Sequence, residues 1–424
     1  MLEDLSPDAP SRPLDRTGWN GGEPAGLSAS SCFDSSGTNS KVRVVQTVFG
    51  RFHHFDLARQ LQRRGCLEAI FTAYPRWKLR EESLPRDRVR TFPWLLAPLM
   101  AKWRFGWRHK WLDRELSWLM AETLDRYVAR RVPVCDVFVG ISGSGLHTMR
   151  HLRKGGVRCI CDRASSHIRY GDRLLREEFS RWGESFPGVD PRSIKKEERE
   201  YALADVITLP SEFARRSFER EGVNSAKLRV LPYGVDLGRF SSDNRAARDG
   251  FAVLFVGQVS LRKGVPYLLE AFARLRHPKK RLVLAGAVAP EMNSLLRKRA
   301  WTEVELPGPQ PRSEVRRLMS EAHVFVLPSV EDGFGLVMAE AMACGCPVIG
   351  TEHTGAPDLI EHGREGFVVP IRDSTTLASR LEQLCQDRDL RDRMAAAALA
   401  RVRSLGGWND YGDSFMRVLR ELMP

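Results

Sequence analysis

Short apolar runs rich in β-branched residues recur along the chain and alternate with longer amphipathic stretches. In the first part of the chain they cover residues 42–48, 67–73, 134–141, 157–162, 204–210 and 228–234. Their length and composition predict β-strands. The stretches between them predict helices, for example over 211–222, where Ser211 can cap the first turn and Gly222 can end the last. Strands that alternate with helices predict a parallel sheet covered on both faces.

A polar, charged segment over residues 238–250 interrupts this pattern, which then starts again. Further apolar runs follow at 251–257, 281–286, 304–308, 323–329, 347–350 and 366–370, and the chain reads as helical from residue 374 onward. Two such arrays, joined by a linker near 235–250, fit an α/β protein with two Rossmann-like domains better than one very large sheet. We expect the ligand site in the cleft between these domains.

Composition excludes several classes of protein. The 424 residues are 42% hydrophobic and 28% charged, which excludes wholesale disorder. Residues 1–40 are rich in Ser, Gly, Pro and Asp, and we predict that they form a disordered leader. The chain has neither an apolar run of about 18 residues, as a membrane helix needs, nor the pattern of a secretory signal. We therefore expect a cytoplasmic protein.

The eight cysteines include two C-x-C pairs, Cys159 with Cys161 and Cys344 with Cys346. This spacing differs from that of zinc sites, and a chain of this length does not depend on a disulfide framework. We therefore predict reduced thiols and no metal at these positions.

The most informative stretch is PSVEDGFGLVMAEAMACGCPVIG, residues 328–350. A buried strand ends at Pro328, and a turn containing Gly333 and Gly335 opens a helix. Glycines let a ligand approach the backbone, and the free N–H groups of a first helical turn favour an anion. Glu340 follows Asp332 by about two turns and is placed to accept hydrogen bonds from ribose hydroxyls.

A second stretch, FVGQVSLRKG at residues 255–264, passes from a strand into a loop with two adjacent cations. Arg262 offers a planar fork and Lys263 a point charge, a combination that suits a diphosphate. By itself such a pair is also typical of a solvated basic loop. Its position at the start of the second array, before the 328–350 stretch, favours the diphosphate.

Together these motifs resemble the retaining glycosyltransferases known as group 1, or family 4. Supporting matches are ADVITLPSEFARRSF (204–218), LRVLPYGVDLGRF (228–240), LFVGQVSLRKGVPYLLEAF (254–272) and TGAPDLIEHGREGFVVP (354–370). The resemblance covers about residues 41–420 and is dense from 204 onward. It implies the GT-B fold, with an acceptor-binding domain over 41–235, a nucleotide-sugar-binding domain over 236–405 and a helix over 406–424 that crosses back to the first domain.

The resemblance also implies roles for individual residues. Arg262 and Lys263 would hold the donor diphosphate and stabilise the leaving group, Glu340 would bind the ribose, and Asp332 would contact the donor sugar. The backbone of Gly333, Phe334, Gly335 and Leu336 would line the sugar–phosphate site, and Gly50 would lie near the phosphates from the other domain. His167 resembles the histidine that the family places in the cleft.

Two positions depart from the family pattern. Gln258 stands where many members have an arginine, and Arg262 could restore that charge. Asp332 replaces the usual glutamate; a shifted register through Glu331 is the alternative, and we favour Asp332. His53 and His54 follow Gly50 and either face the cleft, where one could aid the acceptor, or lie on a helix surface.

A basic, tryptophan-rich segment over residues 76–131 carries 14 Lys and Arg against 7 Asp and Glu, in a chain whose net charge is +13. Trp103, Trp107, Trp111 and Trp118 fall on one broad face of a helix predicted over 101–120. This face could lie on an anionic membrane surface, stack on nucleic-acid bases, or pack on the domain's own sheet. Packing on the domain's own sheet is the simplest interpretation. Binding to an anionic membrane would place the protein at the inner face of the membrane. No recognised nucleic-acid module supports stacking on bases.

These observations predict a retaining glycosyltransferase that moves a sugar from a nucleotide-sugar to a glycan, lipid-linked or small-molecule acceptor. No acidic pair suited to Mg²⁺ is evident, and fixed cations can stabilise the leaving diphosphate, so we expect neither a metal nor a cofactor. Two alternatives stay open: a nucleotide-sugar synthase or epimerase of the same fold, and a catalytically weak nucleotide-binding scaffold. A nicotinamide-dependent oxidoreductase is disfavoured, because no G-x-G-x-x-G follows the first strand of either array.

Overall fold

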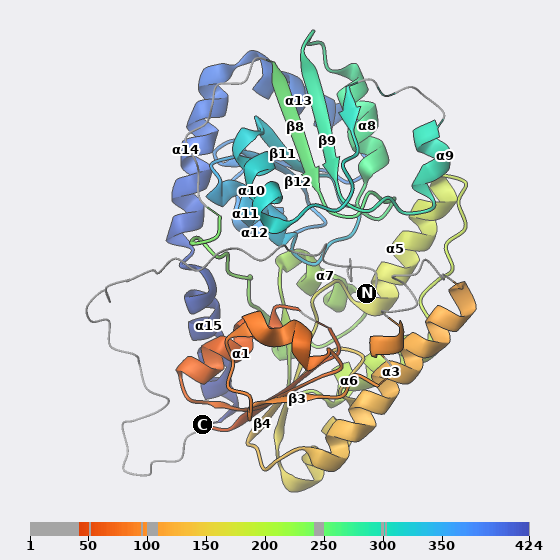
Figure 1. Cartoon of the computed structure of the whole chain (residues 1–424), viewed down its shortest axis with the longest axis vertical. Coiled ribbons are helices and arrows are strands. Elements are labelled where there is room, and N and C mark those ends of the chain that lie inside the picture. The colour runs from red at the N-terminus through yellow and green to blue at the C-terminus, as the bar shows by residue number, and fades with distance from the viewer. Residues whose placement is uncertain are drawn as a thin grey trace, which may run out of the picture.

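The computed structural model describes residues 42–50, 52–94, 96–99, 109–240, 250–297, 301 and 303–423. The predicted leader over 1–40 lies outside these residues. Two parallel sheets are present, each in its own part of the chain (Figure 1). Both sheets are covered by helices, so the predicted α/β class is confirmed.

The first sheet has seven strands in the order β3-β2-β1-β4-β5-β6-β7. All neighbours are parallel, and the strands are short and mostly buried. Their bounds are β1 Val44–Val48, β2 Leu67–Thr72, β3 Val89–Thr91, β4 Val137–Ile141, β5 Arg158–Asp162, β6 Val206–Leu209 and β7 Leu228–Val230. Strand β3 was missed by the hydrophobic pattern, because only three residues of mixed polarity form it.

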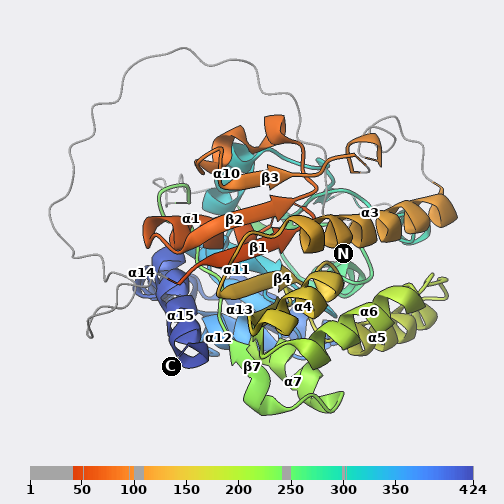
Figure 2. The same ribbon diagram turned by 90° about the horizontal axis from the view of Figure 1, so that it is seen from below.

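The helices of this part are α1 His54–Arg63, α3 Lys110–Arg131, α4 Leu146–Leu152, α5 Ile168–Arg181, α6 Pro191–Leu203 and α7 Glu212–Arg220, with short 3₁₀ turns at Arg76–Glu82, Arg153–Gly155 and Ser225–Lys227. Helices α5 and α6 run side by side along one edge (Figure 2). The predicted cap of α7 is confirmed, because the Ser211 side chain accepts a hydrogen bond from the amide of Ala214.

The second sheet has six strands in the order β10-β9-β8-β11-β12-β13. They are β8 Phe251–Val256, β9 Lys280–Ala285, β10 Val304–Glu305, β11 Val324–Leu327, β12 Val348–Thr351 and β13 Gly366–Val369. The helices are α8 Val265–Arg274, α9 Met292–Arg297, α10 Arg312–Glu321, α11 Leu336–Ala343, α12 Ala356–Leu359, α13 Ser374–Gln386, α14 Arg388–Ser404 and α15 Gly407–Leu422. None of the described helices is both long and apolar enough to cross a membrane.

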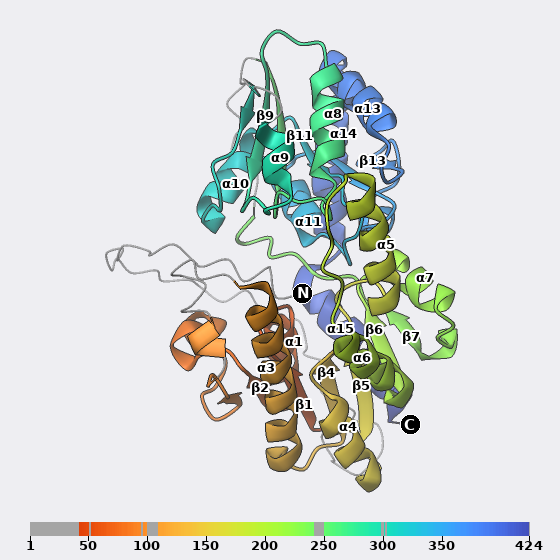
Figure 3. The same ribbon diagram turned by 90° about the vertical axis from the view of Figure 1, so that its right-hand side faces the viewer.

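The two units lie one above the other, and the last helix returns to the first unit (Figure 3). Helix α15 packs on α1, where Arg64 donates to the carbonyl of Asn409 at 3.1 Å and pairs with Asp413. The linker crosses the start of α15 so closely that a Cβ on Gly234 would stand 2.3 Å from the carbonyl carbon of Gly407. Two glycines therefore allow the two crossing segments to touch.

Candidate active site

The loop between β11 and α11 begins the site. Gly335 caps α11 with a φ of 76°, in the left-handed region that favours glycine. Gly333 is required for a different reason: a Cβ there would stand 1.9 Å from the carbonyl oxygen of Ala164, in the loop after β5 of the first unit. The sequence suggested that both glycines make room for a ligand, but Gly333 makes room for the other half of the protein.

The two predicted cations lie opposite two adjacent carboxylates. Nε of Arg262 is 2.9 Å from Oε2 of Glu331, and Nζ of Lys263 is 2.6 Å from Oδ2 of Asp332. The side chains of Lys263 and Asp332 are 12% and 13% exposed, so their pair reaches solvent only at its edge. The structure thus brings Arg262, Lys263 and Asp332 together beside the 333–336 loop, each cation already balanced by a carboxylate.

Glu331 connects the two units. Its Oε1 accepts hydrogen bonds from the hydroxyls of Ser165 and Ser166, at 2.6 and 2.8 Å, and from the Ser166 amide at 3.2 Å. Burial alone would raise the pKa of Glu331, but Arg262 and the two serines outweigh it and hold that pKa well below its usual range. Glu331 is therefore an ionised carboxylate occupied by structural contacts.

Glu340 lies on α11, in the second turn. Burial raises the pKa of its carboxyl to about 7, although Arg312 works in the opposite direction. Within the part of the chain that the structure describes, no hydrogen bond to this carboxylate is present. A largely buried carboxylate without a donor is a costly arrangement that a ligand hydroxyl would relieve.

His167 and Gly50 come from the first unit. His167 caps α5: its Nδ1 accepts from the Arg169 amide at 3.3 Å, and its own amide donates to the Ser217 hydroxyl at 2.8 Å. Burial, together with Arg163, lowers the pKa of His167 to about 4. These contacts are those of a helix cap in the core, so the role predicted for His167 in the cleft has no support from them. Gly50 is buried in the loop between β1 and α1.

A polar cluster lies beside this loop; sequence reasoning named its histidines, His53 and His54, but missed Asp162, and the buried His54 does not lie on a helix surface. Nε2 of His53 is 2.6 Å from Oδ2 of Asp162, and Nε2 of His54 is 3.5 Å from the same oxygen. Burial lowers the pKa of His54 to about 3, with His53 adding to the effect, so this imidazole is neutral at pH 7. The position of Asp162, at the carboxyl end of a predicted strand, was the signal that could have identified it.

His53, His54 and Asp162 also form the group of described residues that could hold a metal ion, since their ligand atoms lie within 4.8 Å of one another. The cysteines of the two C-x-C pairs form no disulfide, as predicted, and they are buried. Above the cluster, the ring of Tyr233 stacks on His53 at 4.3 Å and meets Phe334 at 5.4 Å. Tyr233 therefore connects the cluster with the 333–336 loop.

The tryptophan-rich segment is only partly packed. Trp77, Trp94 and Trp111 are 60%, 74% and 61% exposed, whereas Trp118 lies beneath Arg192, whose guanidinium is 5.1 Å from the ring centroid. Trp103 and Trp107 lie outside the described residues. Packing on the domain's own sheet thus does not account for all the tryptophans of this segment.

Part of the chain matches a known protein family, and several known proteins are similar to it. Residues 239–401 match the family model of the group 1 glycosyl transferases. The chain is 25% identical over 394 residues to the alpha-D-kanosaminyltransferase of Streptomyces kanamyceticus, an alignment covering 86% of this chain and 98% of that protein. It is 32% identical over 244 residues to the D-inositol 3-phosphate glycosyltransferase of Pseudarthrobacter chlorophenolicus, with 52% and 58% covered. The chain spans about half the length of several other curated relatives that it matches.

Solved structures show the same architecture. HepE of Anabaena, in complex with UDP and glucose, superposes with a TM-score of 0.66 at 15% identity, covering 90% of this chain and 100% of that one. Sucrose-phosphate synthase of Thermosynechococcus elongatus gives 0.66 at 19% identity, with 90% and 99% covered. Residues 239–401 thus carry the match to the group 1 glycosyl transferases, and the chain has the GT-B fold, as the motifs predicted.

Proposed function

We propose that this protein is a retaining glycosyltransferase that moves a sugar from a nucleotide-sugar donor to a glycan, lipid-linked or small-molecule acceptor without a metal. The observation that carries the proposal is the buried carboxylate of Glu340, which lacks a hydrogen-bond donor among the described residues. Its carboxylate is largely buried, accepts no hydrogen bond from a described residue and lies beyond the glycine loop that starts α11. The vicinal hydroxyls of a ribose are the donors that such a carboxylate lacks.

The cations beside the loop would serve the leaving diphosphate. Negative charge grows on the diphosphate as the anomeric C–O bond breaks, and fixed cations stabilise that charge without reorganisation. Lys263 and Arg262 are held in place by Asp332 and Glu331. Asp332 lies closer to the sugar side of the loop in this proposal, since Glu331 is occupied by Ser165 and Ser166.

UDP is the first nucleotide to test, because the solved HepE structure contains UDP and glucose. One relative is named for an inositol-phosphate acceptor and another for a transferred kanosaminyl group, so the acceptor is left as a class. The exposed Trp77, Trp94 and Trp111 support a lipid-linked acceptor reached from the inner face of a membrane. The protein would then act in the cytoplasm.

The test is calorimetric binding of UDP, GDP and ADP to the wild type, to Glu340→Ala and to Glu270→Ala. Glu270 is an exposed residue of α8 and serves as the matched control. We expect micromolar binding of one nucleotide that is retained in the control and at least tenfold weaker in Glu340→Ala. Binding without turnover of any nucleotide-sugar would favour the scaffold alternative. Transfer to a free sugar or phosphosugar would favour the synthase, and absence of binding would overturn the proposal.

A further inference from the structure

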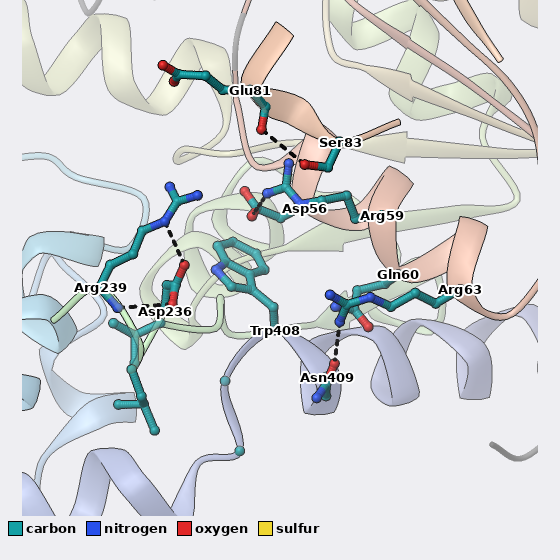
Figure 4. A pocket seen from close by; sticks show the side chains of 14 residues that line it. Asp56, Arg59, Gln60, Arg63, Glu81, Ser83, Asp236, Arg239, Trp408 and Asn409 are labelled. Atoms are coloured by element: carbon teal, nitrogen blue, oxygen red, sulfur yellow. Dashed lines mark hydrogen bonds and ion pairs between the residues drawn. The ribbon is translucent and has the colours of Figure 1, made fainter. Parts of the chain in front are cut away.

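A polar cavity of about 400 Å³ lies at the junction of α1, the inter-unit linker and the start of α15 (Figure 4). None of the residues assigned to the donor lines it. We propose that this cavity binds an uncharged carbohydrate, and that it forms an acceptor subsite separate from the donor loop. The carbohydrate site is argued from its own residues, whereas its role as an acceptor subsite rests on the proposed function.

Trp408 forms the central wall. Figure 4 shows its indole between the Asp236 side of the cavity and the Arg59 and Gln60 side. From behind, the indole is supported by Tyr233 at 6.3 Å and Tyr411 at 5.5 Å between ring centroids. The ring is half-buried, and no described residue accepts a hydrogen bond from its Nε1. Trp408 thus offers a bound ligand a rigid apolar face and the Nε1–H group as a hydrogen-bond donor.

The charges of the lining balance. Three arginines (Arg59, Arg63 and Arg239) stand against three acids (Asp56, Glu81 and Asp236). Arg239 pairs with Asp236 at 3.0 Å, Arg59 pairs with Asp56 and with Glu82, and Arg63 donates to Asn409 at 3.2 Å. Because arginines and acids are equal in number, the side chains of the lining carry no net charge, so we infer a neutral ligand and test phosphate as the alternative.

A sugar ring suits both the apolar face of Trp408 and the uncharged balance of the polar lining. One face of a pyranose presents C–H groups, which the negative face of an aromatic ring attracts, while its hydroxyls bond to planar side chains at the ring edge. Carboxylate, guanidinium and amide groups surround Trp408 in this way. The volume lies in the range of small-ligand pockets, about 300–1,000 Å³.

The cavity is connected to the donor loop through one aromatic side chain. Tyr233 contacts Trp408 on one side and Phe334 and His53 on the other. The linker and the start of α15, which both cross between the units, also line the cavity. A sugar bound here would therefore contact the segments on which the relative position of the units depends.

The test uses the full chain and a panel of neutral probes: methyl glycosides of glucose, galactose, mannose and rhamnose, and maltose, with inorganic phosphate as the anionic comparison. Binding is measured by saturation-transfer NMR and by titration. We expect at least one neutral sugar to bind, at least tenfold more weakly in Trp408→Ala and severalfold more weakly in Asp56→Asn. Glu270→Ala, which changes an exposed residue of α8, should leave sugar binding unchanged.

Asp56→Asn keeps the size of the side chain, so it tests the site even if Trp408→Ala is poorly folded. The proposal is overturned if no sugar of the panel binds, if both variants bind like the wild type, or if phosphate competes for the same site. Glu340→Ala separates the two proposals, because it should lose nucleotide and keep the sugar. Sugar binding without any nucleotide binding would support the carbohydrate site and overturn its role as an acceptor subsite.

Discussion

Among single residues, Glu340 is the one whose protonation is most directly tied to the proposed donor. Its pKa of about 7 means that the carboxylate is half protonated near neutral pH. Only the ionised form accepts strong hydrogen bonds from two hydroxyls, so nucleotide affinity should rise with pH through this range and level off near pH 8. We expect roughly tenfold tighter binding at pH 8 than at pH 6, since each pH unit below a pKa removes about tenfold of the ionised form.

The measurement is a calorimetric titration at pH 6, 7 and 8 on the wild type and on Glu340→Gln. The terminal phosphate of the nucleotide also titrates near pH 6, and the variant carries that contribution alone. Equal slopes in the two proteins would remove Glu340 from the ribose site.

Lys263 should matter more for turnover than for binding. Its ammonium stands 2.6 Å from Asp332, and its work grows as charge develops on the leaving diphosphate. We expect Lys263→Ala to lower kcat by about 10²–10³, the usual cost of one preorganised electrostatic donor, and to weaken nucleotide binding much less. The assay is release of nucleoside diphosphate from the nucleotide-sugar, with the exposed Lys195→Ala as control. Unchanged turnover would exclude the assignment.

Whole elements were more predictable than contacts between them. The runs over 251–257, 323–329 and 347–350 carry β8, β11 and β12 because their apolar, β-branched residues are long enough to show a pattern. The glycine loop and Glu340 could likewise be located from their spacing. That Arg262 and Lys263 face Glu331 and Asp332 could not, because the pairing depends on how two distant loops meet. The cap that His167 forms on α5 could not be predicted either, and its role in the cleft stays a prediction.

The loop that begins α11 is fitted to the first unit at Gly333, and this fit can be tested. A Cβ at this position would overlap the carbonyl oxygen of Ala164, which stands 1.9 Å away. We expect Gly333→Ala to cost about 1–3 kcal/mol of stability, as overpacking usually does, measured by denaturant unfolding. Gly155→Ala is the control, because nothing lies within 4 Å of a Cβ there. A variant as stable as the control would show that the two loops separate easily.

In the whole molecule, Glu331 is where stability and function compete. The same carboxylate holds Arg262 of the second unit and accepts hydrogen bonds from Ser165 and Ser166 of the first. Because Glu331 is buried, its charge is tolerated only with these partners in place. The carboxylate that the first unit engages therefore also neutralises a cation that the proposed donor needs.

Glu331→Gln should separate these two effects. Loss of the charge leaves Arg262 without its carboxylate and weakens the contact between units, so we expect a loss of roughly 1–3 kcal/mol, below the 3–5 typical of a broken buried pair because Arg262 is partly exposed. The Arg262 guanidinium, no longer facing a charged Glu331, should at the same time interact more strongly with the donor diphosphate, so UDP affinity should be unchanged or higher while the melting temperature falls. Ser165→Ala, which keeps the charge and removes one hydrogen bond, should lower stability slightly and leave affinity alone. If Glu331→Gln instead loses both stability and UDP binding, then Glu331 orients Arg262 toward the donor, and the ion pair belongs to the working site rather than competing with it.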